Sequence, residues 1–88
     1  MQGISETLRK RYILMRRGFC NIKDIQAFVP CGYSKAKEIQ KKITEQISEE
    51  GFESLKGVIL TDRLMRFMQI SESKIVMDYE ALKTDALE

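Results

Sequence analysis

The segment Asn21–Glu49, NIKDIQAFVPCGYSKAKEIQKKITEQISE, decides the fold of this chain. Its pattern predicts a short helix, a tight turn and a longer basic helix. In the longer helix, Ala36, Ile39, Ile43 and Ile47 recur at spacings of three, four and four residues, which aligns them on one face. That face must pack inward. The order of a short helix, a tight turn and a longer amphipathic helix therefore predicts a helix-turn-helix.

The first of these two helices has a start signal and a stop signal. Asn21 can cap it, and Asp24 three residues later completes a capping-box-like arrangement at the positive end of the helix dipole. Val29–Pro30 disfavours further helix, and Gly32 can take the positive φ that a sharp turn often requires. We therefore expect this helix to end near Phe28.

The exposed side of the longer helix is basic near its start. We expect the helix to follow a turn over Val29–Tyr33 and to be capped by Ser34. At about 100° per residue, Lys37, Lys41 and Thr44 lie on one flank of the apolar face, Lys35, Lys42 and Gln46 lie on the other, and Glu38 and Glu45 face outward.

In helix-turn-helix proteins, the second helix enters the DNA major groove with its N-terminal residues foremost. We therefore interpret Ser34–Lys42 as a DNA-reading end. Two packed helices joined by a glycine turn also occur in proteins that bind no nucleic acid, so the spacing constrains geometry more than function.

Size and composition argue against catalysis. A chain of 88 residues forms one domain, residues 1–88, with a modest core and no room for a deep catalytic cleft. It contains no histidine or tryptophan, and Cys20 and Cys31 have neither a metal-ligand spacing nor an imidazole nearby. We therefore expect no enzyme activity, no metal, no cofactor and no small-molecule substrate.

The compartment is predicted from the cysteines and the apolar runs. No signal peptide points to an oxidising compartment, so reduced thiols in the cytoplasm are expected. No uncharged run approaches the roughly 20 apolar residues that a membrane span needs.

The charge is unevenly distributed, although the net charge is only +2. Residues 1–18 carry five basic side chains against Glu6, whereas residues 71–88 carry five acidic side chains against two basic ones. Such a field can present a basic face to an anionic partner. Arg16 and Arg17 fit two roles equally well, which are stabilisation of a helix C-terminus and contact with DNA phosphates.

Amphipathic helices are predicted on both sides of the helix-turn-helix. The first is predicted over residues 4–17, before Gly18, and its apolar face comprises Ile4, Leu8, Tyr12 and Met15. The second is predicted over residues 72–86, and its apolar face comprises Ile75, Val76, Tyr79, Leu82 and Ala86. The acidic C-terminal helix would repel DNA, so we do not expect it on the DNA-reading face. Its apolar face needs to be covered, either by folding back on the domain or by forming a homodimer.

Shorter elements are predicted around the central motif. Phe19 and Cys20 are expected to form an apolar link, with Phe19 packed beneath the motif. Gly51 should end the long helix, with Phe52 folded back against it as core. One or two strands within Glu53–Leu60 would form a small wing.

A further helix is expected to begin after the wing. Thr61 would be its capping residue, and Leu64, Phe67 and Met68 would face inward, leaving Arg63 and Arg66 exposed.

The order of elements from Phe19 to Ile70 resembles the small winged helix-turn-helix proteins of mobile genetic elements, the excisionase and MerR-like modules. The matching pieces are NIKDI at 21–25, GYSK at 32–35 and VILTDRL at 58–64. The resemblance implies a phage or mobile-element protein that acts as a transcriptional regulator or a recombination directionality factor.

The sequence thus predicts a mainly α fold, a helix-turn-helix with a possible small β wing and flanking N- and C-terminal helices, that binds double-stranded DNA. The candidate DNA-binding residues are Ser34, Lys35, Lys37, Gln40 and Lys41 on the reading helix, Lys56 on the wing, and Arg16 and Arg17 on the first helix. The alternative is a protein-interaction module, such as an anti-repressor or phage inhibitor, that uses the same scaffold and offers its acidic C-terminal helix to another protein.

Overall fold

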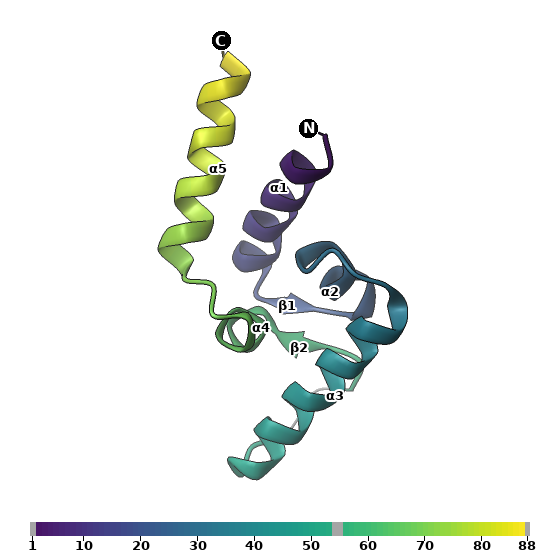
Figure 1. Ribbon diagram of the computed structural model, residues 1–88. Coiled ribbons are helices and arrows are strands. Elements are labelled where there is room, and N and C mark those ends of the chain that lie inside the picture. Colours follow the sequence, from purple (N-terminus) through teal and green to yellow (C-terminus); the bar gives the residue numbers. More distant parts are fainter. Residues whose placement is uncertain (1, 54–55, 88) are drawn as a thin grey trace.

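The computed structural model describes residues 2–53 and 56–87, and these form five helices and two short strands (Figure 1). In chain order the elements are α1 (Gln2–Arg17), β1 (Phe19–Cys20), α2 (Ile22–Phe28), α3 (Tyr33–Glu49), β2 (Ile59–Leu60), α4 (Thr61–Met68) and α5 (Glu72–Leu87). The predicted class, mainly helical with a small sheet and flanking helices, is confirmed.

The start and end of α2 follow from its local sequence. Asn21 accepts a hydrogen bond from the Asp24 backbone N–H at 2.9 Å, and the Asp24 carboxylate accepts one from the Asn21 backbone N–H at 2.9 Å. This reciprocal capping box satisfies two N–H groups that the first helical turn leaves without partners. At the other end, Val29 before Pro30 is extended, and the helix stops at Phe28 as predicted.

The turn into α3 differs from the prediction in two ways. Gly32, and not Ser34, is the N-cap residue, and its carbonyl accepts the first helical bond from the Ala36 N–H at 3.1 Å. Gly32 has φ −79°, so it does not use the left-handed region either. Because the chain enters the helix through this extended glycine, Tyr33 is already helical and Ser34 lies inside the first turn.

The C-terminus of α3 has the expected glycine but a different environment for the next residue. Gly51 has φ +89°, and the Phe52 N–H donates to the Ile47 carbonyl at 3.1 Å, as in a Schellman-type cap. Phe52 is nevertheless 63% exposed, so the prediction that it is core was wrong. The last turns of α3 project away from α1 and α5 (Figure 1).

The sheet pairs two segments that are distant in sequence. β1 and β2 are antiparallel, with Phe19 opposite Leu60 and Cys20 opposite Ile59. Phe19–Cys20 is therefore a strand and not a link. Side chains alternate across a strand, so Cys20 and Ile59 are buried while Phe19 and Leu60 are exposed, and the prediction that Phe19 packs beneath the motif was wrong.

Only one strand was found in the predicted wing. Within the described part of 53–60, Ile59–Leu60 is the strand, and Lys56 and Gly57 form a turn before it. Positions 54 and 55 lie outside the described residues. The wing is thus half of a sheet whose other half precedes α2.

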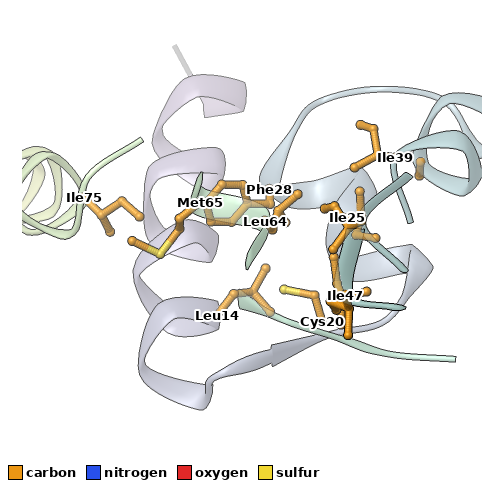
Figure 2. Packing of buried hydrophobic residues seen from close by; sticks show 12 residues of the cluster. Leu14, Cys20, Ile25, Phe28, Ile39, Ile47, Leu64, Met65 and Ile75 are labelled. Carbon is orange, nitrogen blue, oxygen red and sulfur yellow. The ribbon is translucent and has the colours of Figure 1, made fainter. Parts of the chain in front are cut away.

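The core draws on every helix and both strands (Figure 2). Its fully or nearly fully buried members are Leu14, Cys20, Ile25, Phe28, Ala36, Ile39, Ile43, Ile47, Ile59, Leu64, Met65 and Ile75. The predicted inner face of α3 is confirmed, because all four of its residues are among them.

Helix α4 departs from its predicted details. Leu60 is the N-cap residue, and the Thr61 hydroxyl donates to the Leu14 carbonyl at 2.9 Å, so it does not cap α4. Met65 is buried on the inner face, whereas Phe67 and Met68 are only partly buried against the core. Arg66 is exposed as predicted.

Arg63 was predicted to be exposed, but it is partly buried. Its guanidinium forms an ion pair with Glu50 at the end of α3 and lies 6.0 Å from the centre of the Phe52 ring. The Arg63 side chain is only 19% exposed, and its contacts tie the start of α4 to the end of α3.

Helix α5 runs antiparallel to α1 and packs against it (Figure 1). Ile75 is buried, and the Tyr79 ring stacks on Tyr12 with centroids 4.0 Å apart and planes within 3°. The inner face of α5 is thus covered by the chain's own domain. The side chains of Ile4 and Ala86, at the ends of the two predicted faces, lie outside the described residues.

The two free thiols are expected to differ strongly in reactivity. Cys20 is fully buried, with Sγ 3.2 Å from the Thr61 hydroxyl oxygen, and burial raises the pKa of its thiol. Cys31 is only partly buried. The thiolate is the reacting form of a cysteine. A disulfide reagent at neutral pH should therefore modify Cys31 quickly in the folded chain and Cys20 only after denaturation.

The variant Cys31→Ser is the control for this thiol measurement, and it should abolish the fast reaction of the folded chain while keeping the thiol that reacts after denaturation. Two fast thiols in the folded parent chain would contradict the burial of Cys20.

Candidate nucleic-acid interface

Helix α3 presents its basic residues on a surface that the core holds in place. Its four buried residues fix the rotation of the helix, so the remaining positions must face outward. Ser34, Lys35, Lys37 and Lys41 are all exposed, and Gln40 is partly buried beside the apolar face. The five predicted residues of the reading helix thus lie on neighbouring turns at the start of α3, but Lys35 is on the opposite flank from Lys37 and Lys41.

The lysines on the two flanks of α3 have different environments. On one flank, the Lys42 ammonium lies 3.1 Å and the Lys35 ammonium 3.8 Å from the carboxylate oxygens of Glu38. The hydrogen bond from Lys42 and the charge of Lys35 lower the pKa of the Glu38 carboxyl, so this acid is ionised at neutral pH. Two lysines therefore share one fixed negative charge.

On the other flank, the lysines have no such partner. Among the residues that the structure describes, neither Lys37 nor Lys41 takes part in an ion pair. Tyr33 precedes Lys37 by one helical turn and is 57% exposed. Sequence reasoning missed Tyr33 because it placed this residue in the turn; the glycine N-cap directly before it would have been the signal.

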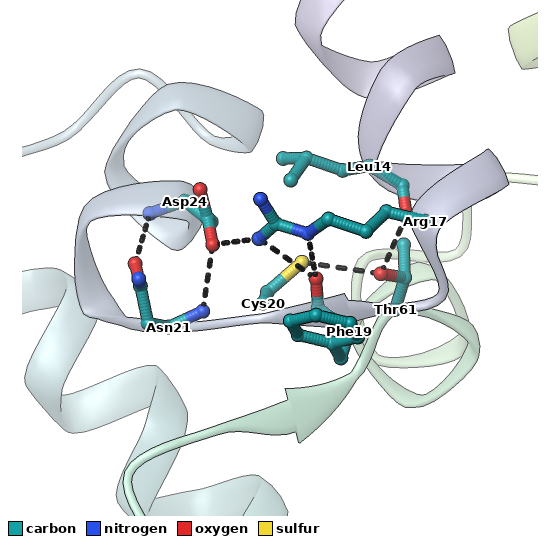
Figure 3. Close-up of polar contacts among 7 residues, drawn as sticks. All are labelled: Leu14, Arg17, Phe19, Cys20, Asn21, Asp24 and Thr61. Carbon is teal, nitrogen blue, oxygen red and sulfur yellow. Dashed lines mark hydrogen bonds and ion pairs between the residues drawn. The ribbon is translucent and has the colours of Figure 1, made fainter.

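Arg17 belongs to a network that holds three elements together (Figure 3). Its guanidinium donates to the Phe19 carbonyl at 3.0 and 3.2 Å and forms an ion pair with the buried Asp24 carboxylate. The same carboxylate oxygen accepts the Asn21 N–H of the capping box. Arg17 thus joins the end of α1 to β1 and α2, and this role differs from both roles predicted from the sequence, which were stabilisation of its own helix C-terminus and contact with DNA phosphates.

Arg11 is also used within the fold. Its Nε–H donates to the Phe28 carbonyl at the end of α2 at 2.8 Å, and its guanidinium lies 5.3 Å from the Phe28 ring centre. Two of the five basic residues of α1 are therefore engaged within the protein. Arg16 remains exposed and forms no ion pair within the described ranges, which leaves it the better candidate for a phosphate contact.

Between Phe19 and Ile70, two exposed lysines lie outside α3. Lys56, the predicted wing residue, is in the turn before β2. Lys23 lies in the first turn of α2 and was not predicted as a candidate from the sequence. Its position close to the Asn21 cap could have indicated it, because the first helix of a helix-turn-helix crosses the DNA backbone.

Within residues 2–53 and 56–87, His, Cys, Asp and Glu side chains form no group of three or more that could hold a metal ion. None of the helices in the described part of the chain has the length and apolar character to cross a bilayer.

Comparisons of the chain with protein-family models, with curated proteins and with solved structures found no significant match.

Proposed function

We propose that this chain is a small, non-catalytic protein that binds double-stranded DNA through the first half of α3. The supporting observation is that exposed lysines gather on two turns of a helix whose opposite face is fixed in the core. A pre-positioned basic helix suits the major groove, and it reaches the groove without reorganising the domain. Arg16 and Lys56 would hold the flanking phosphates, since such contacts position a protein on the duplex.

The proposed biological role is that of a transcriptional regulator or an excisionase-like recombination directionality factor in the cytoplasm. Both roles require sequence-dependent DNA binding without bond chemistry. We also propose that two copies pair to read two half-sites, as helix-turn-helix proteins commonly do. The C-terminal helix remains our candidate for this homodimer, although α1 already covers its inner face.

The salt dependence of binding tests the proposed function directly. We expect the chain to bind a labelled duplex of random sequence at low salt, measured by fluorescence anisotropy. Lys37, Lys41, Lys56 and Arg16 would give four phosphate contacts, so log affinity against log salt should fall with a slope of about −3 to −4.

A peptide of poly-glutamate provides the control for general attraction to anions. Competition by this peptide as strong as that by unlabelled duplex would argue against DNA as the partner. The absence of any binding at low salt would refute the proposal.

A second candidate function, protein binding, is favoured by one feature. An apolar hollow between the end of α3, β2 and α4 is lined by Ile47, Phe52, Val58, Leu60 and Arg63, and Phe52 and Leu60 are exposed. An anti-repressor or phage inhibitor would use such a surface. The variant Phe52→Ser should leave DNA binding intact under the first proposal, and it should abolish capture of the protein partner under the second.

A further inference from the structure

We propose that α3 meets DNA with the flank that carries Tyr33, Lys37 and Lys41, and that the flank with Lys35, Glu38 and Lys42 faces solvent. This inference rests on the proposed function, and it identifies the DNA-contacting surface and the residues that read the sequence.

Helix geometry places the three residues of the first flank in one row. Tyr33, Lys37 and Lys41 follow each other at intervals of four residues, which puts their side chains next to one another along the helix. Gln40 lies beside this row, towards the core. Glu45 follows Lys41 after one more turn, so a carboxylate ends the row at the middle of the helix. The row therefore occupies the N-terminal half of α3.

The opposite flank is a poor surface for DNA. Its two lysines bind Glu38, which remains negatively charged at neutral pH. If this flank faced the groove, the Glu38 carboxylate would lie close to the phosphates and would repel them. Lys35 and Lys42 would also have to exchange an existing ion partner for the phosphate, whereas Lys37 and Lys41 would not.

The chemistry of the first flank suits both parts of DNA recognition. Lysine ammonium groups can donate to phosphate oxygens or to guanine O6 and N7, and a glutamine amide can pair with adenine N6 and N7. The partly buried Gln40 has a restricted side chain, which favours a fixed contact with a base edge. The Tyr33 hydroxyl can donate to a phosphate at the rim of the groove. We therefore assign base reading to Gln40 and phosphate contact to Lys41 and Tyr33, and we assign to Lys37 a phosphate contact on random duplex and a base contact on a target site.

Two double variants with equal loss of charge test this assignment. Lys37→Ala with Lys41→Ala removes both cations of the proposed flank, and Lys35→Ala with Lys42→Ala removes both cations of the other. Each lowers the net charge by two and alters only exposed residues, so both should retain the parent's thermal midpoint. We expect the first pair to weaken binding to random duplex and to make the salt slope shallower by one to two units, and the second to leave the slope unchanged.

A third variant, Glu38→Gln, tests the same inference in the opposite direction. It releases Lys35 and Lys42 from their shared carboxylate. Binding at about 0.15 M salt should change by less than about twofold, because Glu38 lies outside the row that contacts DNA and its solvent-exposed charge is screened over roughly 8 Å. A several-fold gain with a steeper salt slope would show that this flank faces the DNA.

The outcomes separate this inference from the proposed function. Failure of the parent chain to bind duplex would overturn both. The parent chain could bind duplex while the Lys35→Ala, Lys42→Ala variant loses at least as much salt slope as the Lys37→Ala, Lys41→Ala variant. That result would support DNA binding and overturn the assignment of the flank.

Discussion

Replacing Ile43 by alanine is expected to lower the free energy of unfolding by about 2–5 kcal/mol, the usual cost of deleting a buried isoleucine side chain beyond its β-carbon. Ile43 is fully buried at the centre of the inner face of α3, between Ile39 and Ile47. The core cluster that contains Ile43 draws on every helix and both strands, so we expect the resulting cavity to close only in part. Domains of this size have a total stability of only about 5–15 kcal/mol, so the loss is a large part of it.

The variant Ile13→Ala is a matched control for Ile43→Ala. Ile13 is also helical, but it is 52% exposed on the outer side of α1. Both variants gain the same helix propensity, and we expect the control to change the free energy of unfolding by no more than about 0.5 kcal/mol. At roughly 4–8 °C per kcal/mol, Ile43→Ala should lower the thermal midpoint by about 10 °C or more. Equal midpoints for the two variants would show that the inner face of α3 is not buried.

The helices and their inner faces were predictable because their determinants are local. The positions of Ile39 and Ile43 on α3, and of Ile75 on α5, follow from the helical period, and the Asn21 capping box spans only three residues. Such patterns need no knowledge of the rest of the chain. The local signals were less reliable for the caps of α3 and α4, since Ser34 and Thr61 are both good N-cap residues in sequence and neither caps in the structure.

The features that escaped prediction depend on contacts between distant residues. β1 has only two residues, and its partner strand lies about 40 residues later, so no periodicity marks it. The roles of Arg17 and Thr61 likewise depend on where Asp24 and the Leu14 carbonyl are placed by the fold. Side-chain hydrogen bonds of this kind are set by tertiary structure, and an arginine near a helix C-terminus gives no sign of them.

The exposure of the basic residues on α3 could be predicted from the sequence, but the difference between its two flanks could not. Helix phase alone separated Lys37 and Lys41 from Lys35 and Lys42. The ion pairs of Glu38 then distinguish the two flanks, because they show which lysines already have a partner. The sequence does not determine the rotamers of long exposed side chains. The difference in ion pairing between the two flanks could therefore be found only from the structure.

Replacing Ile75 by aspartate is expected to detach α5 or to unfold the domain. Ile75 is 2% exposed, and a carboxylate placed there would have to lose its hydration without an ion partner from the core, a change that costs several kcal/mol. The stacked Tyr12 and Tyr79 rings would not compensate, because such a pair contributes only about 0.5–1.5 kcal/mol beyond the area it buries. We expect a fall of at least about 10 °C in the thermal midpoint, measured by circular dichroism.

The variant Met77→Asp gives both the control and a test of the homodimer. It introduces the same charge two residues later on the same helix, at a side chain that is 67% exposed, so the fold should be unaffected. If two copies associate through the outer side of α5, Met77→Asp should reduce the mass in sedimentation equilibrium from dimer to monomer without lowering the midpoint. If α5 serves only to complete the core, Met77→Asp should have the parent's mass and midpoint, and only Ile75→Asp should be destabilised. A loss of stability in Met77→Asp as large as that in Ile75→Asp would contradict the packing of α5 against α1, because it would mean that the outer side of the helix is the buried one.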